Sequence, residues 1–205
     1  MGVKVLEIYN ETRTIGNYFD LSGFEVYKLD YQNLNADNIN TQKIIEEFDK
    51  PDIIWLTPCC STYSMAGISH HRRKINDVLE PISEYAKYCD DLNRKLIQVI
   101  KELNPKLYFI ENPRGGLRKM PFMEGLPRYT ITYCQYGDTR QKPTDIWTNH
   151  PNPRFKPVCH RGDPCHEAAP RGCTKGGTQR LRKKDQRRNM PELLCYHIIN
   201  LCREV

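Results

Sequence analysis

Short apolar runs alternate along the chain with stretches whose apolar residues recur at helical spacing. The runs VKVLEIY, FEVYKLDY, PDIIWL and KLYFIENP predict four buried strands, at residues 3–9, 24–31, 51–56 and 106–113. Helices are predicted from the turn after residue 9 to Gly23, over 41–48 with Thr41 as N-cap, and over 80–103. The amphipathic stretch PELLCYHIINLC predicts a last helix.

The order of these elements predicts an α/β fold. Strands that alternate with helices indicate a mainly parallel, twisted sheet with helices on both faces. Two later apolar runs, YTITYCQYG and TDIWTN, predict strands that add an antiparallel hairpin at one edge. Polar motifs recur where the predicted strands end, and in an open parallel sheet these ends meet at one cleft. The sequence therefore predicts a site at the carboxyl edge of the sheet.

The chain has 205 residues, enough for one domain with a substantial core. Its start lacks the pattern of a signal peptide and no apolar run is long enough to span a bilayer, so we expect a cytoplasmic protein without membrane contact. The net charge of +6 is uneven, because residues 154–188 hold 11 lysines and arginines against three acids. This segment is predicted to bind a polyanion, although a solvated basic loop would have the same composition.

Nine cysteines are many for this length, but their odd number and the missing signal peptide argue against a disulfide framework. Reduced thiols, a nucleophile and a metal site are the remaining possibilities. The stretch TPCCSTYSMAG, residues 57–67, places two adjacent thiols where the third predicted strand ends. A thiol there, together with the acid of the ENP motif after the fourth strand, suggests covalent catalysis in which a thiolate attacks an electron-poor carbon.

The motifs PCCSTYS, ENP and QYGDTRQKP, in this order, resemble those of the DNA cytosine-5 methyltransferases. That family carries Pro-Pro-Cys-Gln, Glu-Asn-Val and Gln-x-Arg-x-Arg. The stretches LEIYNETRTIG, ISHHRRK, YFIENPRGGLRKM, YGDTRQKPTDIWTN and PCHEAAPRG are similar to a short, phage-type branch of it, over nearly the whole chain. The resemblance implies a Rossmann-like methyltransferase fold, S-adenosylmethionine as methyl donor and double-stranded DNA as partner.

The resemblance also implies roles for individual residues. The family's catalytic cysteine stands two residues after the proline, so Cys60 would add to C6 of a cytosine flipped out of the duplex. Glu111 would hold a proton on N3, and Asn112 would orient the loop. Arg140 would lie near the base, with Lys142 where the family usually has a second arginine. Without the surrounding motifs, Cys60 could be a buried structural thiol and Glu111 an ordinary acid at a strand end.

The family binds its cofactor at a glycine-rich turn after the first strand and at acids that follow the second strand. Asp30 and Asp37 match these acids, although either could be an ordinary turn aspartate. Glu11 stands where the family has a glycine, so we favour a shifted turn over a modified methyl donor or an inactive relative. The predicted cofactor-binding residues are Tyr9, Asn10, Glu11, Thr12, Arg13, Ile15, Asp30, Tyr31, Asp37, Asn38 and Pro58.

The family's target-recognition region precedes the last helix, and here that interval is the short basic segment 151–188. We expect residues 1–150 and the helix within 189–205 to form the catalytic and cofactor-binding domain. Basic residues of the loops and of this segment are predicted to contact DNA phosphates. They are His70, His71, Arg72, Arg73, Arg114, Arg118, Arg180, Arg182, Lys183 and Lys184. For the loop residues, a solvated basic face is the alternative interpretation.

The recognition segment also contains Cys159, His160, Cys165, His166 and Cys173, and four such side chains could bind zinc. The candidate ligands are Cys159, Cys165, His166 and Cys173. Their spacing, C-x5-C-H-x6-C, is not that of a standard zinc finger. A loop ordered by packing on the sheet or by DNA is therefore the favoured interpretation, with zinc as the alternative.

Two classes of function follow from the sequence. A DNA cytosine-5 methyltransferase is favoured, because Cys60, Glu111 and Arg140 are all present. A DNA-binding pseudoenzyme is the alternative, which Glu11 favours. A zinc-dependent base deaminase needs Pro-Cys-x-x-Cys, and position 62 is Thr62, which argues against this class. An RNA substrate stays open, because basic charge does not distinguish the two nucleic acids.

Overall fold

The computed structural model describes residues 2–9, 14–34, 37, 39–167 and 189–204. Its strands are β1 (Lys4–Tyr9), β2 (Glu25–Asp30), β3 (Ile53–Leu56), β4 (Arg72–Ile75), β5 (Val78–Pro81), β6 (Leu107–Pro113), β7 (Arg128–Thr132) and β8 (Pro143–Thr148). Its α-helices are α1 (Thr14–Leu21), α2 (Thr41–Phe48), α3 (Ile68–His71), α4 (Glu84–Leu103) and α6 (Glu192–Arg203). Short 3-10 helices are η1 (Tyr31–Asn33), η2 (Gly116–Lys119), η3 (Pro121–Met123) and η4 (Tyr133–Tyr136).

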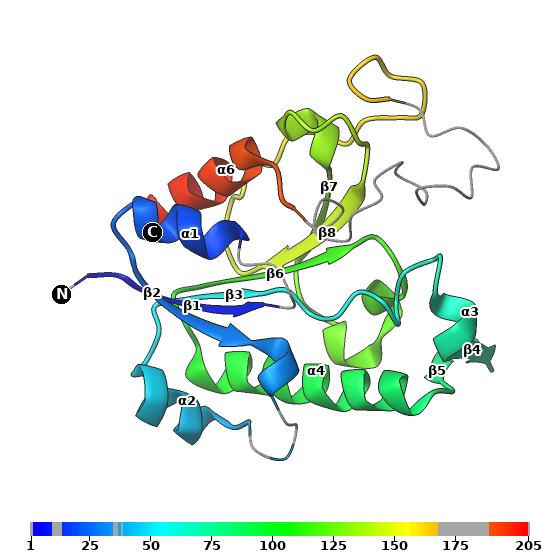
Figure 1. The fold of residues 1–205 in the computed structure, drawn as a ribbon, viewed down its shortest axis with the longest axis horizontal. Helices are drawn as coiled ribbons and strands as arrows, with labels where there is room; N and C mark the ends of the chain where they lie inside the picture. Colours follow the sequence, from blue (N-terminus) through cyan, green and yellow to red (C-terminus); the bar gives the residue numbers. More distant parts are fainter. Residues whose placement is uncertain (1, 10–13, 35–36, 38, 168–188, 205) are drawn as a thin grey trace.

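The central sheet has six strands in the order β2-β1-β3-β6-β8-β7. The first four are parallel, whereas β8 is antiparallel to both β6 and β7. Helices α1 and α6 lie on one face of the sheet and α2 and α4 on the other (Figure 1). The predicted α/β fold, with a mainly parallel sheet and an antiparallel edge hairpin, is confirmed.

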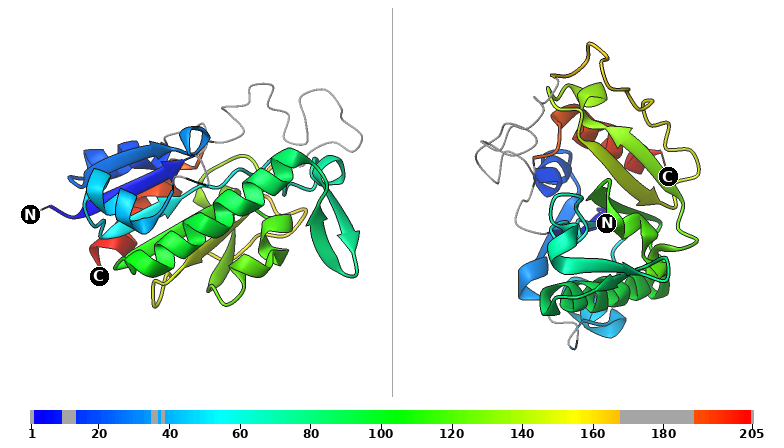
Figure 2. Two further views of the ribbon diagram at one scale, coloured as in Figure 1. Left: turned by 90° about the horizontal axis from the view of Figure 1, so that it is seen from below. Right: turned by 90° about the vertical axis from the view of Figure 1, so that its right-hand side faces the viewer.

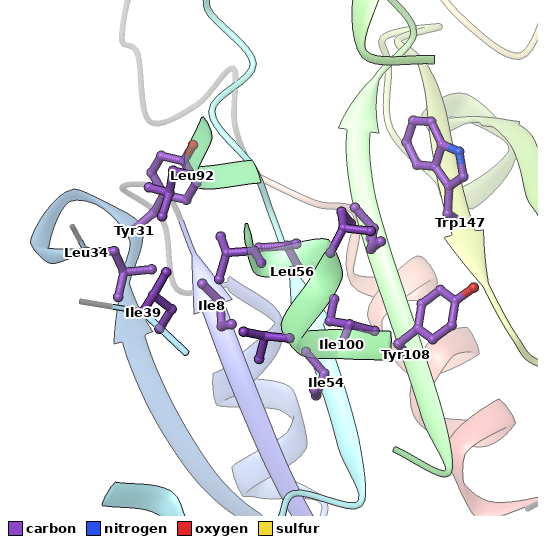
Figure 3. Packing of buried hydrophobic residues seen from close by; sticks show 14 of the residues in the cluster. Ile8, Tyr31, Leu34, Ile39, Ile54, Leu56, Leu92, Ile100, Tyr108 and Trp147 are labelled. Atoms are coloured by element: carbon purple, nitrogen blue, oxygen red, sulfur yellow. The ribbon is translucent and has the colours of Figure 1, made fainter. Parts of the chain in front are cut away.

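The central strands β1, β3 and β6 bury both of their faces, because successive side chains point to opposite sides of the sheet. Leu6 and Ile8 of β1, with Ile54 and Leu56 of β3, pack toward α4 in one core (Figure 3). Their neighbours in sequence, including Val5, belong to a second core beneath α1 and α6. This double burial explains why the strands read as continuous apolar runs.

Helix α4 begins four residues later than predicted. Ser83 is its N-cap and accepts a hydrogen bond from the Ala86 backbone N–H at 3.1 Å, and the helix ends before Asn104 in a left-handed conformation. The residues before it form the hairpin β4–β5, which projects beyond the end of α4 (Figure 2). The predicted loop over 57–74 thus contains α3 and the first strand of this hairpin.

The predicted strand over 129–137 is also shorter than expected. Strand β7 ends at Thr132, and the chain turns into η4, which Gly137 terminates with a positive φ of 88°. Only a residue without a side chain adopts this conformation readily, so the Tyr-Gly pair favours a turn over a continued strand. No helix in the described part of the chain is long and apolar enough to cross a bilayer.

Candidate active site

The carboxyl edge of the sheet has a topological switch between β1 and β3. From β1 the chain runs outward to β2 on one side, and from β3 it leads to β6 on the other. Ligand sites of open α/β sheets form at such a point, outside the carboxyl ends of the strands. The loop Thr57–Gly67 leaves β3 here, and its first backbone N–H donates to the Ile8 carbonyl at 2.8 Å. Cys60 is therefore held at the predicted edge.

The loop that follows β3 is hydrogen-bonded to β6 and to the loop after β6. The Asn112 amide donates to the Pro58 carbonyl at 3.1 Å, and the Gly116 N–H donates to the Tyr63 carbonyl at 2.7 Å. A Cβ atom on Gly115 would clash with that same carbonyl, so this approach requires a glycine. The Asn112 contact agrees with its predicted role in orienting the cysteine loop, which stays a prediction.

Glu111 is buried on β6, and its side chain follows the strand alternation onto the α6 face. Its carboxylate oxygen Oε1 accepts a hydrogen bond from the Tyr133 hydroxyl at 3.0 Å. Burial raises the pKa of Glu111, while the positive charge of Lys142 and the bond from Tyr133 oppose that rise. Glu111 is thus a carboxyl group that holds its proton at higher pH than usual.

Cys60, Lys142 and Glu111 are close enough to change one another's protonation. Burial raises the pKa of the Cys60 thiol to about 11, the negative charges of Cys59 and Glu111 add to the rise, and Lys142 lowers it. Burial lowers the pKa of Lys142, which Glu111 and Cys60 raise in turn. The Lys142 ammonium also lies 4.3 Å from the centre of the Tyr133 ring.

The adjacent thiol of Cys59 faces the other way. It is 2% exposed, packs in the core beneath α4, and contacts the Ser61 and Tyr85 hydroxyls at 2.8 and 2.9 Å. Hydrogen bonds from Cys89, Ser61 and Tyr85 lower the pKa of Cys59. Acidity alone would favour Cys59 as nucleophile, but its position excludes a substrate, whereas Cys60 is half-buried and close enough to Glu111 for its charge to act on the thiol.

Arg140 lies near these groups and is itself held in place. Its guanidinium Nε donates to Asp138 at 2.8 Å, and its Cζ lies 6.0 Å from the centre of the Tyr133 ring. A further bond reaches the Asn189 carbonyl at 3.3 Å, which ties the segment that leads into α6 to this edge. Catalytic roles for Arg140 and for its neighbours stay predictions.

Of the predicted cofactor-binding residues, Asp30 is best placed. It is the last residue of β2 and pairs in register with Tyr9, the last residue of β1. A carboxylate at this edge fits a ligand with hydroxyl groups, such as the ribose of S-adenosylmethionine. Asp37 is exposed and forms an ion pair with Lys95 at 3.7 Å.

Other predicted cofactor-binding residues lie deeper in the protein. Tyr31 is 2% exposed and its hydroxyl donates to Asn93 at 3.0 Å, while Ile15 belongs to the core beneath α6. These two side chains offer almost no surface to a ligand, because protein atoms already cover them. Pro58 is buried as well, and it takes part through its carbonyl, which the Asn112 amide contacts.

The prediction that Arg72 contacts DNA is wrong. Its side chain is fully buried and donates to both oxygens of Asp90, at 2.6 and 2.9 Å, and to the Thr62 carbonyl at 2.9 Å. The hairpin turns Arg72 inward, and the strand alternation turns Arg73 outward. Position in a basic run therefore did not indicate exposure.

The other predicted DNA contacts within the described residues differ in exposure. His70, Arg73 and Arg114 are exposed, as a phosphate contact requires. The His71 ring is within 2.8 Å of the Ser83 hydroxyl, and Arg118 pairs with Asp145, its Nε donating at 2.8 Å. DNA contact by any of them stays a prediction, and His71 and Arg118 already have protein partners.

A buried polar network behind the cysteine loop was not predicted from the sequence. The Tyr63 hydroxyl donates to Asp90 at 2.6 Å and accepts from the Asn93 amide at 2.9 Å. Arg72 lies 4.0 Å above the Tyr63 ring and completes the pairing of Asp90. The network joins the cysteine loop, the hairpin and α4.

Three of the predicted metal ligands come together with a fourth residue that was not predicted. Cys159, Cys165 and His166 meet Cys134, the second residue of η4. The remaining predicted site residues lie outside the described part of the chain, as do the turn after β1 and the most basic part of the recognition segment. They are Asn10, Glu11, Thr12, Arg13, Asn38, Cys173, Arg180, Arg182, Lys183 and Lys184.

Comparison with known proteins supports the resemblance drawn from the motifs. No model of a known protein family matches the sequence. A protein of Frog virus 3 (isolate Goorha), named "Probable DNA (cytosine-5)-methyltransferase", is 26% identical over 170 residues, which are 74% of this chain and 75% of that protein.

A solved structure is also similar. It is that of a "putative DNA modification methyltransferase encoded within prophage" (E. coli), with a TM-score of 0.47 and 14% identity. The match covers 71% of this chain and 46% of the solved one, so the chain spans about half of its length. Sequence motifs and the viral relative agree, and we conclude that this chain resembles the DNA cytosine-5 methyltransferases over most of its length.

Proposed function

We propose that this chain is a DNA cytosine-5 methyltransferase that uses S-adenosylmethionine and a covalent bond to Cys60. One observation carries the proposal: a thiol, an ammonium group and a buried carboxyl group influence one another's charge at the carboxyl edge of the parallel strands. The name of the Frog virus 3 relative, which states this activity, supports it.

The proposed reaction begins with the Cys60 thiolate. Its sulfur forms a bond to C6 of a flipped cytosine, and the electrons of the C5–C6 double bond move through the ring to N3. Glu111, whose pKa burial raises, holds a proton at N3 and so neutralises the charge that arrives there. C5 becomes electron-rich and is able to attack a methyl group.

S-adenosylmethionine, when bound, would supply that methyl group on a positively charged sulfur. After methylation, a base removes the proton from C5, the C5–C6 double bond forms again, and Cys60 leaves C6 as the thiolate. The positive charge of Lys142 favours the thiolate in both directions, because it opposes the effect of burial on the Cys60 pKa. Among the described residues, Asp30 is the side chain we expect beside the ribose.

The proposal is tested by trapping the covalent bond to the base. Duplex DNA that carries 5-fluorocytosine loses no fluorine after methylation at C5, so Cys60 would stay attached to C6. We expect a complex that survives denaturing electrophoresis, forms with S-adenosylmethionine, and disappears in Cys60→Ser but not in Cys59→Ser. A trapped complex in Cys60→Ser, or none in the wild-type protein with any duplex that it methylates, would contradict the covalent role.

A second candidate function rests on the sequence at position 11. Glu11 stands where the resemblance predicts a glycine, and a carboxylate there would lie near the carboxylate of the methyl donor. A DNA-binding pseudoenzyme is the alternative that follows from this. Calorimetry of S-adenosylmethionine binding, with and without duplex DNA, separates the two, because saturable binding supports the enzyme and folded protein that binds only DNA supports the pseudoenzyme.

A further inference from the structure

Cys134, Cys159, Cys165 and His166 form a compact cluster at the antiparallel edge of the sheet. Cys134 belongs to η4, directly after β7, and the other three come from the irregular segment 158–167. Their ligand atoms all lie within 4.8 Å of one another. Cys134 and Cys159 are buried, whereas Cys165 and His166 are half-buried. Chain segments far apart in sequence therefore bring together four side chains of the types that bind zinc.

We propose that this cluster binds one Zn²⁺ ion through all four side chains. A tetrahedral ion with usual Zn–S and Zn–N bonds places two sulfurs about 3.8 Å apart and a sulfur and a nitrogen about 3.6 Å apart. The Sγ atoms of Cys159 and Cys165 each lie 3.6 Å from Nδ1 of His166. Cys134 Sγ lies 3.0 Å from that of Cys159 and 3.5 Å from that of Cys165. An ion would require the separation between the Cys134 and Cys159 sulfurs, the shortest of these distances, to lengthen.

The chemistry of the ligands selects the ion. Three thiols and one imidazole are soft ligands, which suit zinc and exclude magnesium or calcium. Four protein ligands close the coordination sphere, so no position is left for a catalytic water. The site is structural, and none of its four ligands is a residue of the proposed chemistry at Cys60.

Neighbouring polar groups hold the ligands in place, as they do around zinc sites in general. The Gln135 amide donates to the Cys165 sulfur at 3.5 Å, which would stabilise a thiolate there. The Cys159 backbone is fixed on both sides, since its N–H donates to the Thr132 hydroxyl at 3.1 Å and its carbonyl accepts from the Gln141 amide at 3.2 Å.

The segment that supplies three of the ligands buries little apolar surface. Of residues 151–167, only Pro153 and Cys159 are buried. Hydrogen bonds hold it at a few points, and a metal bond across 25 residues, from Cys134 to Cys159, would add a constraint that apolar burial does not supply. The bond also joins the start of the basic segment to η4, whose Tyr133 contacts Glu111.

Cys134 takes the place that the sequence suggested for Cys173. The four described side chains already make a complete tetrahedral set, so Cys173 is not needed as a ligand. Cys134 could not be found from spacing, because it lies in a predicted strand, outside the segment where the other ligands gather.

The test is the metal content of the purified full-length protein, prepared without a polyhistidine tag. Mass spectrometry of the metal should find about one zinc per chain. His166→Ala and Cys134→Ser should lose it, whereas His166→Cys should keep it. Matched controls are His160→Ala, which changes an exposed histidine beside Cys159, and Cys173→Ser, and both should keep the metal.

Several outcomes would overturn the proposal. Reduced wild-type protein that contains no zinc and takes up none from a zinc–chelator buffer would do so, as would zinc lost from Cys173→Ser but kept in Cys134→Ser. A disulfide between Cys134 and Cys159 would appear as two thiols fewer than the nine of the sequence after denaturation with a chelator. If Cys134→Ser does not fold, the zinc content of His166→Ala and His166→Cys decides whether the cluster binds the metal. None of these measurements requires methyl transfer.

Discussion

The two sides of the loop Thr57–Gly67 differ in how completely their buried polar groups are paired. On the α4 side, Arg72 and Asp90 share two hydrogen bonds, and Tyr63 adds a third to the same carboxylate. The other side, called the cleft side here, contains Glu111 and Lys142, whose pKa values burial shifts. The side-chain oxygen of Asn112 on this side has no partner among the described residues. The hydrogen bonds of the buried charged groups are therefore complete on the α4 side, which we call the saturated side, and incomplete on the cleft side.

This difference shows how one loop can be both rigid and reactive. A buried ion pair whose hydrogen bonds are all made fixes the backbone that carries it. Groups whose pKa values burial has shifted are able to give and take protons. We infer that the α4 side positions the loop and that the cleft side performs the chemistry.

The largest expected effect on the rate of methyl transfer comes from replacing each of the two adjacent cysteines by alanine. Cys60→Ala should reduce methyl transfer by at least about 10³-fold, because it removes the proposed nucleophile. Affinity for duplex DNA should change little. Cys59→Ala is the matched control and should keep transfer within about tenfold, since it removes a core side chain with its hydrogen bonds and leaves Cys60 in place. Loss of transfer in Cys59→Ala together with normal transfer in Cys60→Ala would reverse the assignment of the two sides.

Glu111→Gln should have the next largest effect. The amide cannot supply the proton that we place on N3, so single-turnover methylation should slow by about 10² to 10⁴-fold. Glu124→Gln, a change of an exposed acid, serves as the control and should leave the rate unchanged. If Glu111→Gln keeps the wild-type rate, another acid protonates the base, and the cleft side has been assigned wrongly.

The parallel half of the sheet, and the position of Cys60 and Glu111 at its carboxyl edge, were predictable from the sequence for a physical reason. Strands buried on both faces appear as continuous apolar runs, and polar residues directly after such runs must lie at the sheet edge. Cys60 and Glu111 stand at two such positions, and the order of the motifs connected them. Their neighbour Tyr133 was missed, because a tyrosine within an apolar run gives no sign of its contact.

The saturated side could not be predicted, because its partners are distant in sequence and ordinary in type. Arg72 stands in the run HHRRK, where nothing distinguishes a buried arginine from an exposed one. Its partner Asp90 is 18 residues away on α4, and its neighbour Asp91 makes it look like part of a solvated helix face. Only the hairpin β4–β5, which replaced a predicted loop, turns Arg72 toward it.

The saturated side should be tested through stability. Arg72→Met leaves Asp90 as an uncompensated buried charge, which should lower the free energy of unfolding by about 3–5 kcal/mol. Arg73→Met, at the neighbouring exposed position, should change it by no more than about 0.5 kcal/mol and should weaken DNA binding instead. Urea denaturation measures both variants. Equal stability of the two would show that the network does not hold the loop.

Tyr133→Phe should have the smallest effect on the methylation rate. It tests whether the hydrogen bond to Glu111 stabilises the charged or the neutral form of that carboxyl group. The Tyr133 hydroxyl donates to the Glu111 carboxylate and so favours its charged form, which lowers the pKa of Glu111. Its removal should raise that pKa further, so that Glu111 is protonated over a wider pH range and the rate at neutral pH stays within about threefold of wild type. A pH titration of the Glu111 side-chain carboxyl carbon by NMR would measure the shift.

Tyr136→Phe is the matched control. It removes a hydroxyl of the same turn that accepts a hydrogen bond from the Lys156 N–H, and it should leave the Glu111 pKa unchanged. A fall of the Glu111 pKa in Tyr133→Phe would mean that the hydroxyl stabilises the neutral acid, and the cleft side would then be as tightly paired as the side behind it.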